Sequence, residues 1–300
     1  MRHERKALEV FPKAFDYFAP RSLAEALSLV ERYGDDARLL AGGQSVIPLM
    51  KLRFLDPAYL IDLKWVPDLK GIELRDREIC CGAMTRHCDM ERSKDISRNI
   101  PLLHQAATEI ADVQVRNRGT LGGALCQADP AGDWAVTALA LGARMRCTSQ
   151  SGDRVISAGA FFKDTFTPAI DSREILVDVR FPIPPAGSKG VYIKIRKRAG
   201  DFAIASAAVQ ITCDANGRCA NVGVGLGGVG STPVLPNQVV DYLTGRTLTA
   251  KAIEQACDLL EKQIDPIEDI RGSVAYKRRL ARVVLERALH QIMNNYGTHS

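Results

Sequence analysis

The sequence predicts an α+β protein in which short α/β units precede a separate antiparallel sheet. Three observations support this prediction. Over roughly the first 180 residues, short apolar runs alternate with segments of helical period. A segment with three prolines, residues 182–187, then interrupts the pattern. Beyond it, three strand-like runs are followed by three helical segments, an order typical of a sheet covered by helices.

The first domain is expected over residues 1–62 as a small α/β unit. Ser22 is a suitable N-cap for the helix that follows, and Gly34 is a suitable residue to end it. Strands are expected over residues 38–41 and 59–63. A glycine pair and a helix beginning near Ser45 lie between them.

The second domain is expected over residues 63–182. Its predicted strands are residues 78–82, 143–147 and 174–181. Helices are predicted from residue 89 to 110 and from 133 to 141, with a glycine-rich turn over 119–123.

The third domain is expected over residues 188–296. Alternation predicts strands over 191–197, 204–213 and 219–225, and Asn216-Gly217 is a strong signal for a hairpin turn. Helical spacing continues over 235–243, 250–264 and 275–294. We therefore expect a three-stranded antiparallel sheet with helices packed on one face.

Composition excludes several classes of protein. The 300 residues are 46% hydrophobic, 25% charged and 6% aromatic, which is close to the average for globular proteins. No apolar run reaches the roughly 18 residues of a membrane span, and residues 1–9 lack a signal-peptide core. The net charge of +5 is mild and its basic clusters are short. We expect a cytoplasmic protein with no transmembrane segment and no nucleic-acid partner.

The cysteines and histidines do not form a recognisable metal or nucleophile motif. The eight cysteines contain no C-x-x-C pair, so they are interpreted as small buried apolar residues, and no metal site is expected. His3, His87, His104, His290 and His299 are scattered along the chain. His87 and His104 are expected at the surface or at helix caps. No catalytic residue is predicted.

Two glycine-rich turns carry the strongest chemical signal. Residues 39–45 read LLAGGQS and residues 118–124 read RGTLGGA. Glycines allow a ligand close to the backbone, and successive amide groups form a concave site for anions. Each turn alone is more often a plain connection, and neither matches a Rossmann or Walker A pattern. Together they indicate one diphosphate held between two loops, hence a dinucleotide cofactor on a different fold.

These segments resemble the FAD-binding medium subunits of molybdenum hydroxylases, the family of xanthine dehydrogenase and aerobic carbon monoxide dehydrogenase medium chains. The first FAD loop of that family is similar to residues 41–45, AGGQS, with their continuation 47–53, IPLMKLR. The second is similar to residues 115–123, VRNRGTLGG. Further matches are ADPAGD at 128–133, GDFA at 200–203 and RGSVAY at 271–276. The resemblance covers nearly the whole chain in order.

The resemblance implies both a fold and a role. The fold is an FAD-binding domain of the vanillyl-alcohol-oxidase/PCMH type, with two α/β subdomains (1–62 and 63–182), and a C-terminal domain of the CO dehydrogenase flavoprotein type. The role is an FAD-containing oxidoreductase subunit. It takes electrons from the [2Fe–2S] clusters of a small partner subunit, which a large molybdopterin subunit reduces. The flavin passes them to an external acceptor, within a dimer of heterotrimers.

Other functions stay open at this stage. A stand-alone flavin reductase using NAD(P)H and a cofactor-free assembly subunit are the alternatives from other classes. A relative of hydroxybenzoyl-CoA reductase would need an additional cysteine cluster, which this sequence lacks. The substrate cannot be read from this chain, because in the family it binds to the large subunit.

The resemblance also assigns FAD contacts, chiefly backbone N–H groups around the diphosphate with hydroxyls from Ser45 and Thr120. Asp133 is assigned to a polar part of FAD and Phe202 to the isoalloxazine ring. The full set is Leu40, Ala41, Gly42, Gly43, Gln44, Ser45, Val46, Thr120, Leu121, Gly122, Gly123, Ala124, Asp133, Leu176, Lys194 and Phe202. Leu176 and Lys194 are placed near the ring or the adenine end.

Three residues depart from the family pattern, and three have an alternative interpretation. Ala124 replaces the common Ser or Asn, Gln44 stands where His is also common, and Phe202 lacks the hydroxyl of a Tyr. Without the resemblance, Asp133 could be a helix N-cap, Phe202 a core residue and Lys194 a solvent-facing strand residue. Tyr192 and Arg198 are equally ambiguous and are not assigned to the site.

Overall fold

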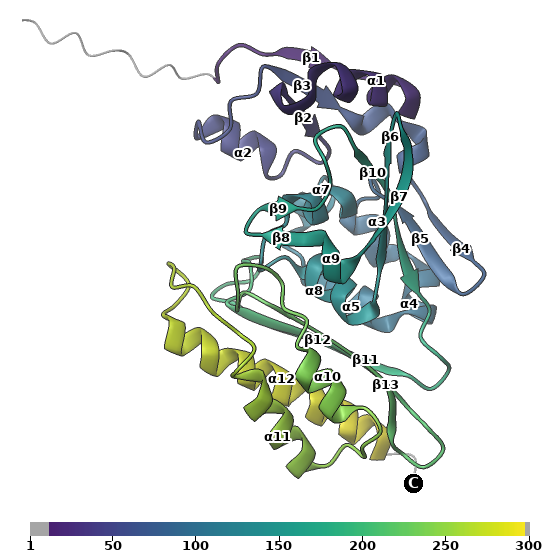
Figure 1. The fold of residues 1–300 in the computed structure, drawn as a ribbon, viewed down its shortest axis with the longest axis vertical. Coiled ribbons are helices and arrows are strands. Elements are labelled where there is room, and N and C mark those ends of the chain that lie inside the picture. Colours follow the sequence, from purple (N-terminus) through teal and green to yellow (C-terminus); the bar gives the residue numbers. More distant parts are fainter. Residues whose placement is uncertain (1–11, 298–300) are drawn as a thin grey trace, which may run out of the picture.

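The computed structural model describes residues 12–297 and confirms the predicted α+β class. The three larger sheets succeed one another along the longest axis of the molecule, in sequence order from one end to the other (Figure 1). Residues 1–9, which include His3, and His299 lie outside the described residues, so the structure does not test the predictions made for them. Within residues 12–297, no helix is both long and apolar enough to cross a membrane.

The N-terminal sheet is parallel and has the order β1-β3-β2. Its strands are β1 (Asp16–Phe18), β2 (Ala37–Leu40) and β3 (Tyr59–Asp62). Its helices are α1 (Leu23–Tyr33) and α2 (Val46–Lys51). As predicted, α1 begins after Ser22, whose Oγ accepts a hydrogen bond from the Glu25 N–H, and ends at Gly34, where φ is +47°.

The middle sheet is antiparallel, in the order β4-β5-β10-β6-β7. Its strands are β4 (Ile72–Arg75), β5 (Glu78–Gly82), β6 (Arg144–Ser149), β7 (Gly152–Ser157) and β10 (Ile175–Pro182). The helices between them are α3 (His87–Arg92), α4 (Lys94–Asn99), α5 (Pro101–Glu109), α6 (Val113–Arg116), α7 (Leu121–Gln127), α8 (Asp133–Leu141) and α9 (Ala158–Phe161). A small hairpin pairs β8 (Phe162–Asp164) with β9 (Thr167–Pro168).

Two predictions for this part need correction. The single helix expected over residues 89–110 is broken, because Ser93 caps α4 and Pro101 opens α5. The glycine turn expected over 119–123 becomes helical at Leu121. Thr120 is the N-cap there, and its Oγ1 accepts the Gly123 N–H.

The C-terminal sheet is antiparallel, as predicted, with β12 between β11 and β13. Its strands are β11 (Lys189–Ile195), β12 (Ala205–Cys213) and β13 (Cys219–Gly227). Its helices are α10 (Asn237–Leu243), α11 (Ala250–Leu260) and α12 (Val274–Gly297). The predicted hairpin turn is present, with φ at +72° for Gly217.

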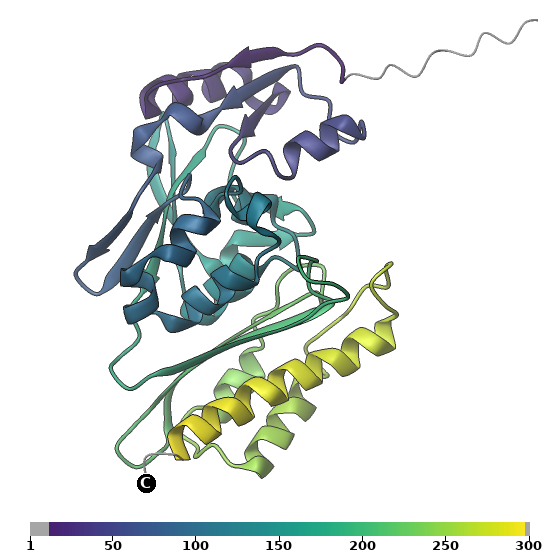
Figure 2. The ribbon, with the colours of Figure 1, turned by 180° about the vertical axis from the view of Figure 1, so that it is seen from behind.

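The C-terminal sheet is covered on both faces. Its own helices cover one face, as expected, whereas α5 and α8 of the middle part pack against the other (Figure 2). Glycines on β13 permit this close contact. A Cβ atom at Gly223 would lie 1.9 Å from the Ala140 carbonyl oxygen, and one at Gly225 would lie 2.1 Å from that of Val136. Helix α8 therefore joins the middle and C-terminal cores.

The cysteines lie mostly in these cores. All eight are free thiols, and Cys81, Cys88, Cys147, Cys219 and Cys257 are buried. Within the part of the chain that the structure describes, no group of three or more His, Cys, Asp or Glu side chains is arranged to hold a metal ion.

Candidate functional site

A cavity of about 690 Å³ lies where the three parts of the molecule meet. Its volume is within the range of small-molecule and cofactor sites, roughly 300–1,000 Å³. The walls come from the turn after β2, the loop before α7, the start of α8, the strand β11 and the loop that follows it. The assigned residues that line it are Ala41, Gly42, Gly43, Gln44, Ser45, Val46, Thr120, Gly122, Gly123, Ala124, Asp133, Leu176, Lys194 and Phe202.

Leu40 and Leu121 of the assigned set do not line this cavity. Leu40 is buried in a small core with Met50 and Leu60. Leu121 is fully buried in the main core of the middle part. Their places in the loops bring their backbones near the site, but their side chains point elsewhere.

The two glycine-rich loops contact each other directly. A Cβ atom at Gly42 would lie 2.3 Å from the Arg118 carbonyl oxygen and 2.7 Å from the Gly119 Cα. Gly43 has φ at +76°, a conformation that other residues rarely adopt. Gly42 is therefore required by the packing of one loop on the other, and Gly43 by its own backbone conformation, in addition to any approach of a ligand.

The first loop presents a run of unused backbone donors. Among residues 12–297, the N–H groups of Gly43, Gln44, Ser45 and Val46 have no hydrogen-bond acceptor, and Ser45 does not cap α2 through its side chain. All four residues line the cavity. Successive amides of this kind form a site for an anion.

The second loop differs, because its amides are used within the protein. The Leu121 N–H donates to the Thr85 carbonyl oxygen at 2.9 Å and the Gly122 N–H donates to that of Ala83 at 2.8 Å. The Gly123 N–H donates to Thr120 Oγ1. The second loop can therefore contact a ligand through its side chains and through the exposed backbone of its glycines. The unused amide donors for a ligand belong to the first loop.

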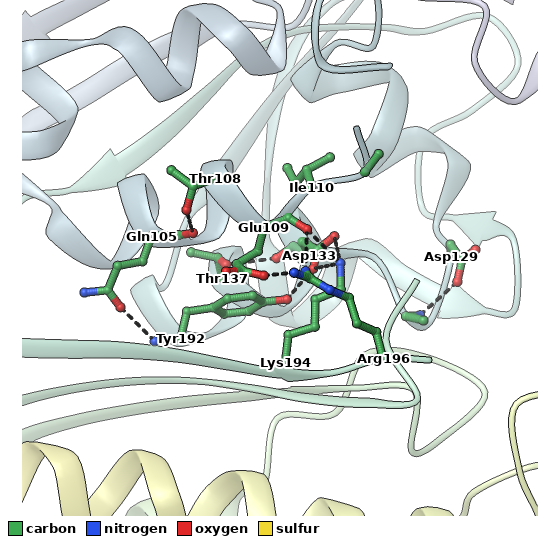
Figure 3. A network of polar contacts seen from close by, with 12 residues as sticks. Gln105, Thr108, Glu109, Ile110, Asp129, Asp133, Thr137, Tyr192, Lys194 and Arg196 are labelled. Atoms are coloured by element: carbon green, nitrogen blue, oxygen red, sulfur yellow. Dashed lines mark hydrogen bonds and ion pairs between the residues drawn. The ribbon is translucent and has the colours of Figure 1, made fainter. Parts of the chain in front are cut away.

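Asp133 lies at the centre of a buried polar network (Figure 3). It is the first residue of α8, and its carboxylate accepts hydrogen bonds from the Tyr192 hydroxyl and from Lys194 Nζ, the latter at 2.9 Å. The N-cap position is Gly132, so the alternative that Asp133 caps the helix is wrong. The Lys194 side chain is only 1% exposed, so the solvent-facing alternative is also wrong.

The network joins three elements. Tyr192 and Lys194 are two residues apart on β11, so both side chains point to the face that packs on α5 and α8. Lys194 Nζ also donates to the Glu109 carbonyl oxygen at 3.0 Å, and Arg196 pairs with the Glu109 carboxylate. The sequence-based prediction missed Tyr192, although its spacing from Lys194 on an alternating strand is a usable signal.

Burial dominates the electrostatics of this network. It raises the pKa of the Asp133 carboxyl, an effect opposed by the Lys194 ammonium and the Tyr192 hydroxyl. Burial and the neighbouring Asp133 raise the pKa of Tyr192 well above its usual value. These groups hold one another, so the arrangement offers fixed polar walls rather than a free acid or base.

His87 was expected at the surface or in a helix cap, and that prediction is wrong. It is 4% exposed and lines the cavity at the start of α3. Its Nδ1 accepts a hydrogen bond from Trp134 Nε1 at 2.9 Å. Burial, with a smaller effect of Arg116, lowers the pKa of His87 to about 4. The contact joins residues 47 positions apart, so no local pattern marks it.

Phe202 lies in the loop after β11 and is 47% exposed, so the core alternative is wrong. It lines the cavity, and the Arg271 guanidinium lies 5.7 Å from its ring centroid. Leu176 on β10 is buried and contributes an apolar part of the wall.

Comparison with known proteins identifies the domains around this cavity. Residues 13–184 match the family described as the FAD binding domain in molybdopterin dehydrogenase. Residues 190–292 match the CO dehydrogenase flavoprotein C-terminal domain.

Similar proteins match over almost their full length. The chain is 35% identical to the carbon monoxide dehydrogenase medium chain of Afipia carboxidovorans, over 94% of this chain and 98% of that one. It is 37% identical to the 6-hydroxypseudooxynicotine dehydrogenase complex subunit alpha of Paenarthrobacter nicotinovorans, over 94% and 96%. A solved carbon monoxide dehydrogenase chain from Hydrogenophaga pseudoflava superimposes with a TM-score of 0.91 at 36% identity, over 93% and 97%.

These matches confirm the family that the glycine-rich loops indicated, and with it FAD as the cofactor. The chain belongs to the FAD-binding medium subunits of molybdenum hydroxylases, a family of oxidoreductase subunits.

Proposed function

We propose that this chain passes electrons from the [2Fe–2S] clusters of a small partner subunit, through FAD, to an external acceptor. A large molybdopterin subunit completes the complex, as a dimer of heterotrimers in the cytoplasm. The observation that carries the proposal is the row of four unused amides of Gly43–Val46 on the cavity wall, because these donors suit the diphosphate of FAD.

The remaining cavity residues suit the other parts of the cofactor. FAD, when bound, supplies the redox chemistry, and the protein supplies binding and orientation. The polar groups of Asp133 and Lys194 bind a polar part of the cofactor, and Phe202 packs against its ring system. Leu176 excludes water from one wall. No side chain of this chain is needed to move a proton.

The substrate class belongs to the partner subunits in this proposal. Two relatives of nearly equal similarity belong to complexes named for carbon monoxide and for 6-hydroxypseudooxynicotine. Similar medium chains therefore belong to complexes that act on different substrates. This is expected if the medium chain receives only electrons and does not bind the substrate.

The binding half of the proposal is tested with the double substitution Gly42→Val and Gly43→Val. A side chain at position 42 collides with the Arg118 backbone and forces the loops apart, and one at position 43 meets Ile47 and is strained by the positive φ. We expect the variant to lose its flavin absorbance on gel filtration. Gly159→Ala is the matched control, because its Cβ would meet only the Leu235 side chain at an ordinary 3.6 Å. Full flavin retention in the double variant contradicts the assignment.

The electron-transfer half is tested by mixing the FAD-loaded chain with a reduced [2Fe–2S] partner subunit under anaerobic conditions. Bleaching of the flavin absorbance by the partner supports the proposal. Bleaching by NAD(P)H without any partner supports a stand-alone reductase instead. A chain that stays colourless with FAD supports the assembly-subunit alternative.

A further inference from the structure

His87 is packed against the second glycine-rich loop. Its backbone N–H donates to the Gly119 carbonyl oxygen at 3.1 Å. A Cβ atom at Gly119 would lie 2.6 Å from His87 Nε2, so the imidazole fits closely behind the glycine. Both residues line the cavity. The ring is thus held where a bound cofactor passes the loop.

The hydrogen bond from Trp134 determines the tautomer of His87. An indole N–H can only donate, so the accepting Nδ1 carries no proton and the proton of the neutral ring is on Nε2. Burial and Arg116 lower the pKa of His87 to about 4, so the ring is neutral near pH 7.

The Nε2–H group has no acceptor among residues 12–297. In the same part of the chain, Ser206 Oγ is the single side-chain nitrogen or oxygen that is both fully enclosed and without a partner. Nε2 is therefore not enclosed, and since His87 is 4% exposed and lines the cavity, its access is to the cavity. A buried donor directed into a cofactor cavity without a protein acceptor indicates an acceptor on the ligand.

The start of α8 reinforces this position. Trp134 directly follows Asp133, and the N-cap, Gly132, offers no side-chain cap. The three residues line the cavity together with His87. The uncapped end of the helix and the Nε2–H group both favour an electron-rich part of a ligand.

We propose that His87 is a positioning residue that donates a hydrogen bond from Nε2–H to the bound FAD, with Trp134 holding the donor tautomer in place. This inference rests on the proposed function, because it requires FAD in the cavity. His87 belongs to neither the glycine-rich loops nor the Asp133 network.

The test is FAD titration of the full apo chain, followed by flavin fluorescence and visible absorption. His87→Phe keeps a ring but removes the donor, and loss of one hydrogen bond corresponds to a Kd increase of about 3- to 10-fold. His87→Gln can accept from Trp134 and still donate, so we expect a Kd within about 2-fold of the wild type. Trp134→Phe no longer fixes the tautomer of His87, so we expect its Kd to lie between those of His87→Gln and His87→Phe. His104→Gln, on α5 away from the cavity, is the control.

The comparison separates this inference from the proposed function. A wild-type Kd and flavin spectrum in His87→Phe overturns the inference while FAD binding itself stands. Equal weakening in His87→Phe and His87→Gln also overturns it, because shape rather than the donor would then matter. If the wild-type chain binds no FAD, both fail. If His87→Phe does not fold, the Kd of Trp134→Phe is compared with that of the wild type instead, because the His87 ring stays in place in that variant. An unchanged Kd then overturns the inference.

Discussion

The replacement of Lys194 by Met tests the ion pair that joins the C-terminal sheet to the middle part. Met keeps most of the apolar stem of Lys but removes the ammonium group, which leaves the buried Asp133 carboxylate with the Tyr192 hydroxyl and a backbone N–H as donors but no positive charge. At 2.9 Å and an effective dielectric constant of about 20, the lost attraction is about 6 kcal/mol. Relief from burying the ammonium offsets part of this, and one-sided removal from a buried pair costs about 3–5 kcal/mol.

The same change has a defined pH dependence. Burial already raises the pKa of Asp133 above 3.8, and loss of the ammonium raises it further. Between the unfolded and the raised folded pKa, the native state binds more protons than the unfolded state. The free energy of unfolding therefore falls as pH rises through that window. The stability deficit of Lys194→Met should be largest near neutral pH and should shrink on acidification.

Thermal and urea unfolding measure this deficit. A loss of 3–5 kcal/mol corresponds to a fall in Tm of roughly 6–20 °C. Adding Asp133→Asn to Lys194→Met should restore much of the loss, because no buried charge is left unpaired. Lys251→Met on the exposed side of α11 is the control. The reasoning is refuted if Lys194→Met unfolds with the wild-type midpoint at neutral pH, or if the double variant loses the sum of the single losses.

Two further predictions concern other contacts. Gly225→Ala places a Cβ atom 2.1 Å from the Val136 carbonyl oxygen, so we expect a loss of about 1–3 kcal/mol in urea unfolding, whereas the exposed Asn221→Ala on the same strand should be neutral. Arg154 holds the pKa of Glu174 below 4.5, so this pair stabilises the fold above about that pH and the contribution is lost as pH falls through the lowered pKa. Arg154→Met should therefore narrow the difference in Tm between neutral and acid solution; an unchanged difference would contradict the assignment.

Local signals predicted most of the elements that build the site. Ser22 and Gly34 delimit α1, and the Asn-Gly pair marks the hairpin of the C-terminal sheet, because caps and turns depend on a few neighbouring residues. Alternation also explains why the Leu40 side chain does not line the cavity. Successive strand residues point in opposite directions, so Leu39 faces the cavity and Leu40 faces the core.

Contacts distant in sequence could not be predicted in this way. The bond between His87 and Trp134 needs the start of α3 to lie beside the start of α8, and nothing near either residue encodes that. Likewise, the glycines of β13 read as ordinary strand residues until α8 is seen against them. The part of the site that the sequence does reveal is the part built on contiguous backbone.

The glycine-rich loops and the C-terminal sheet are connected by an unbroken series of contacts. Gly42 packs on the backbone at Gly119, which in turn leaves space for His87. His87 bonds Trp134 on α8, and the preceding residue on that helix holds Lys194 of β11. Each contact is short and largely buried, so displacement of one loop must either break a link or move the next. We therefore expect FAD bound to the first loop to stabilise the C-terminal sheet as well, although that sheet contributes few residues to the cavity wall. The domain without a glycine loop of its own is thus connected to the cavity through packing and the buried Lys194–Asp133 pair.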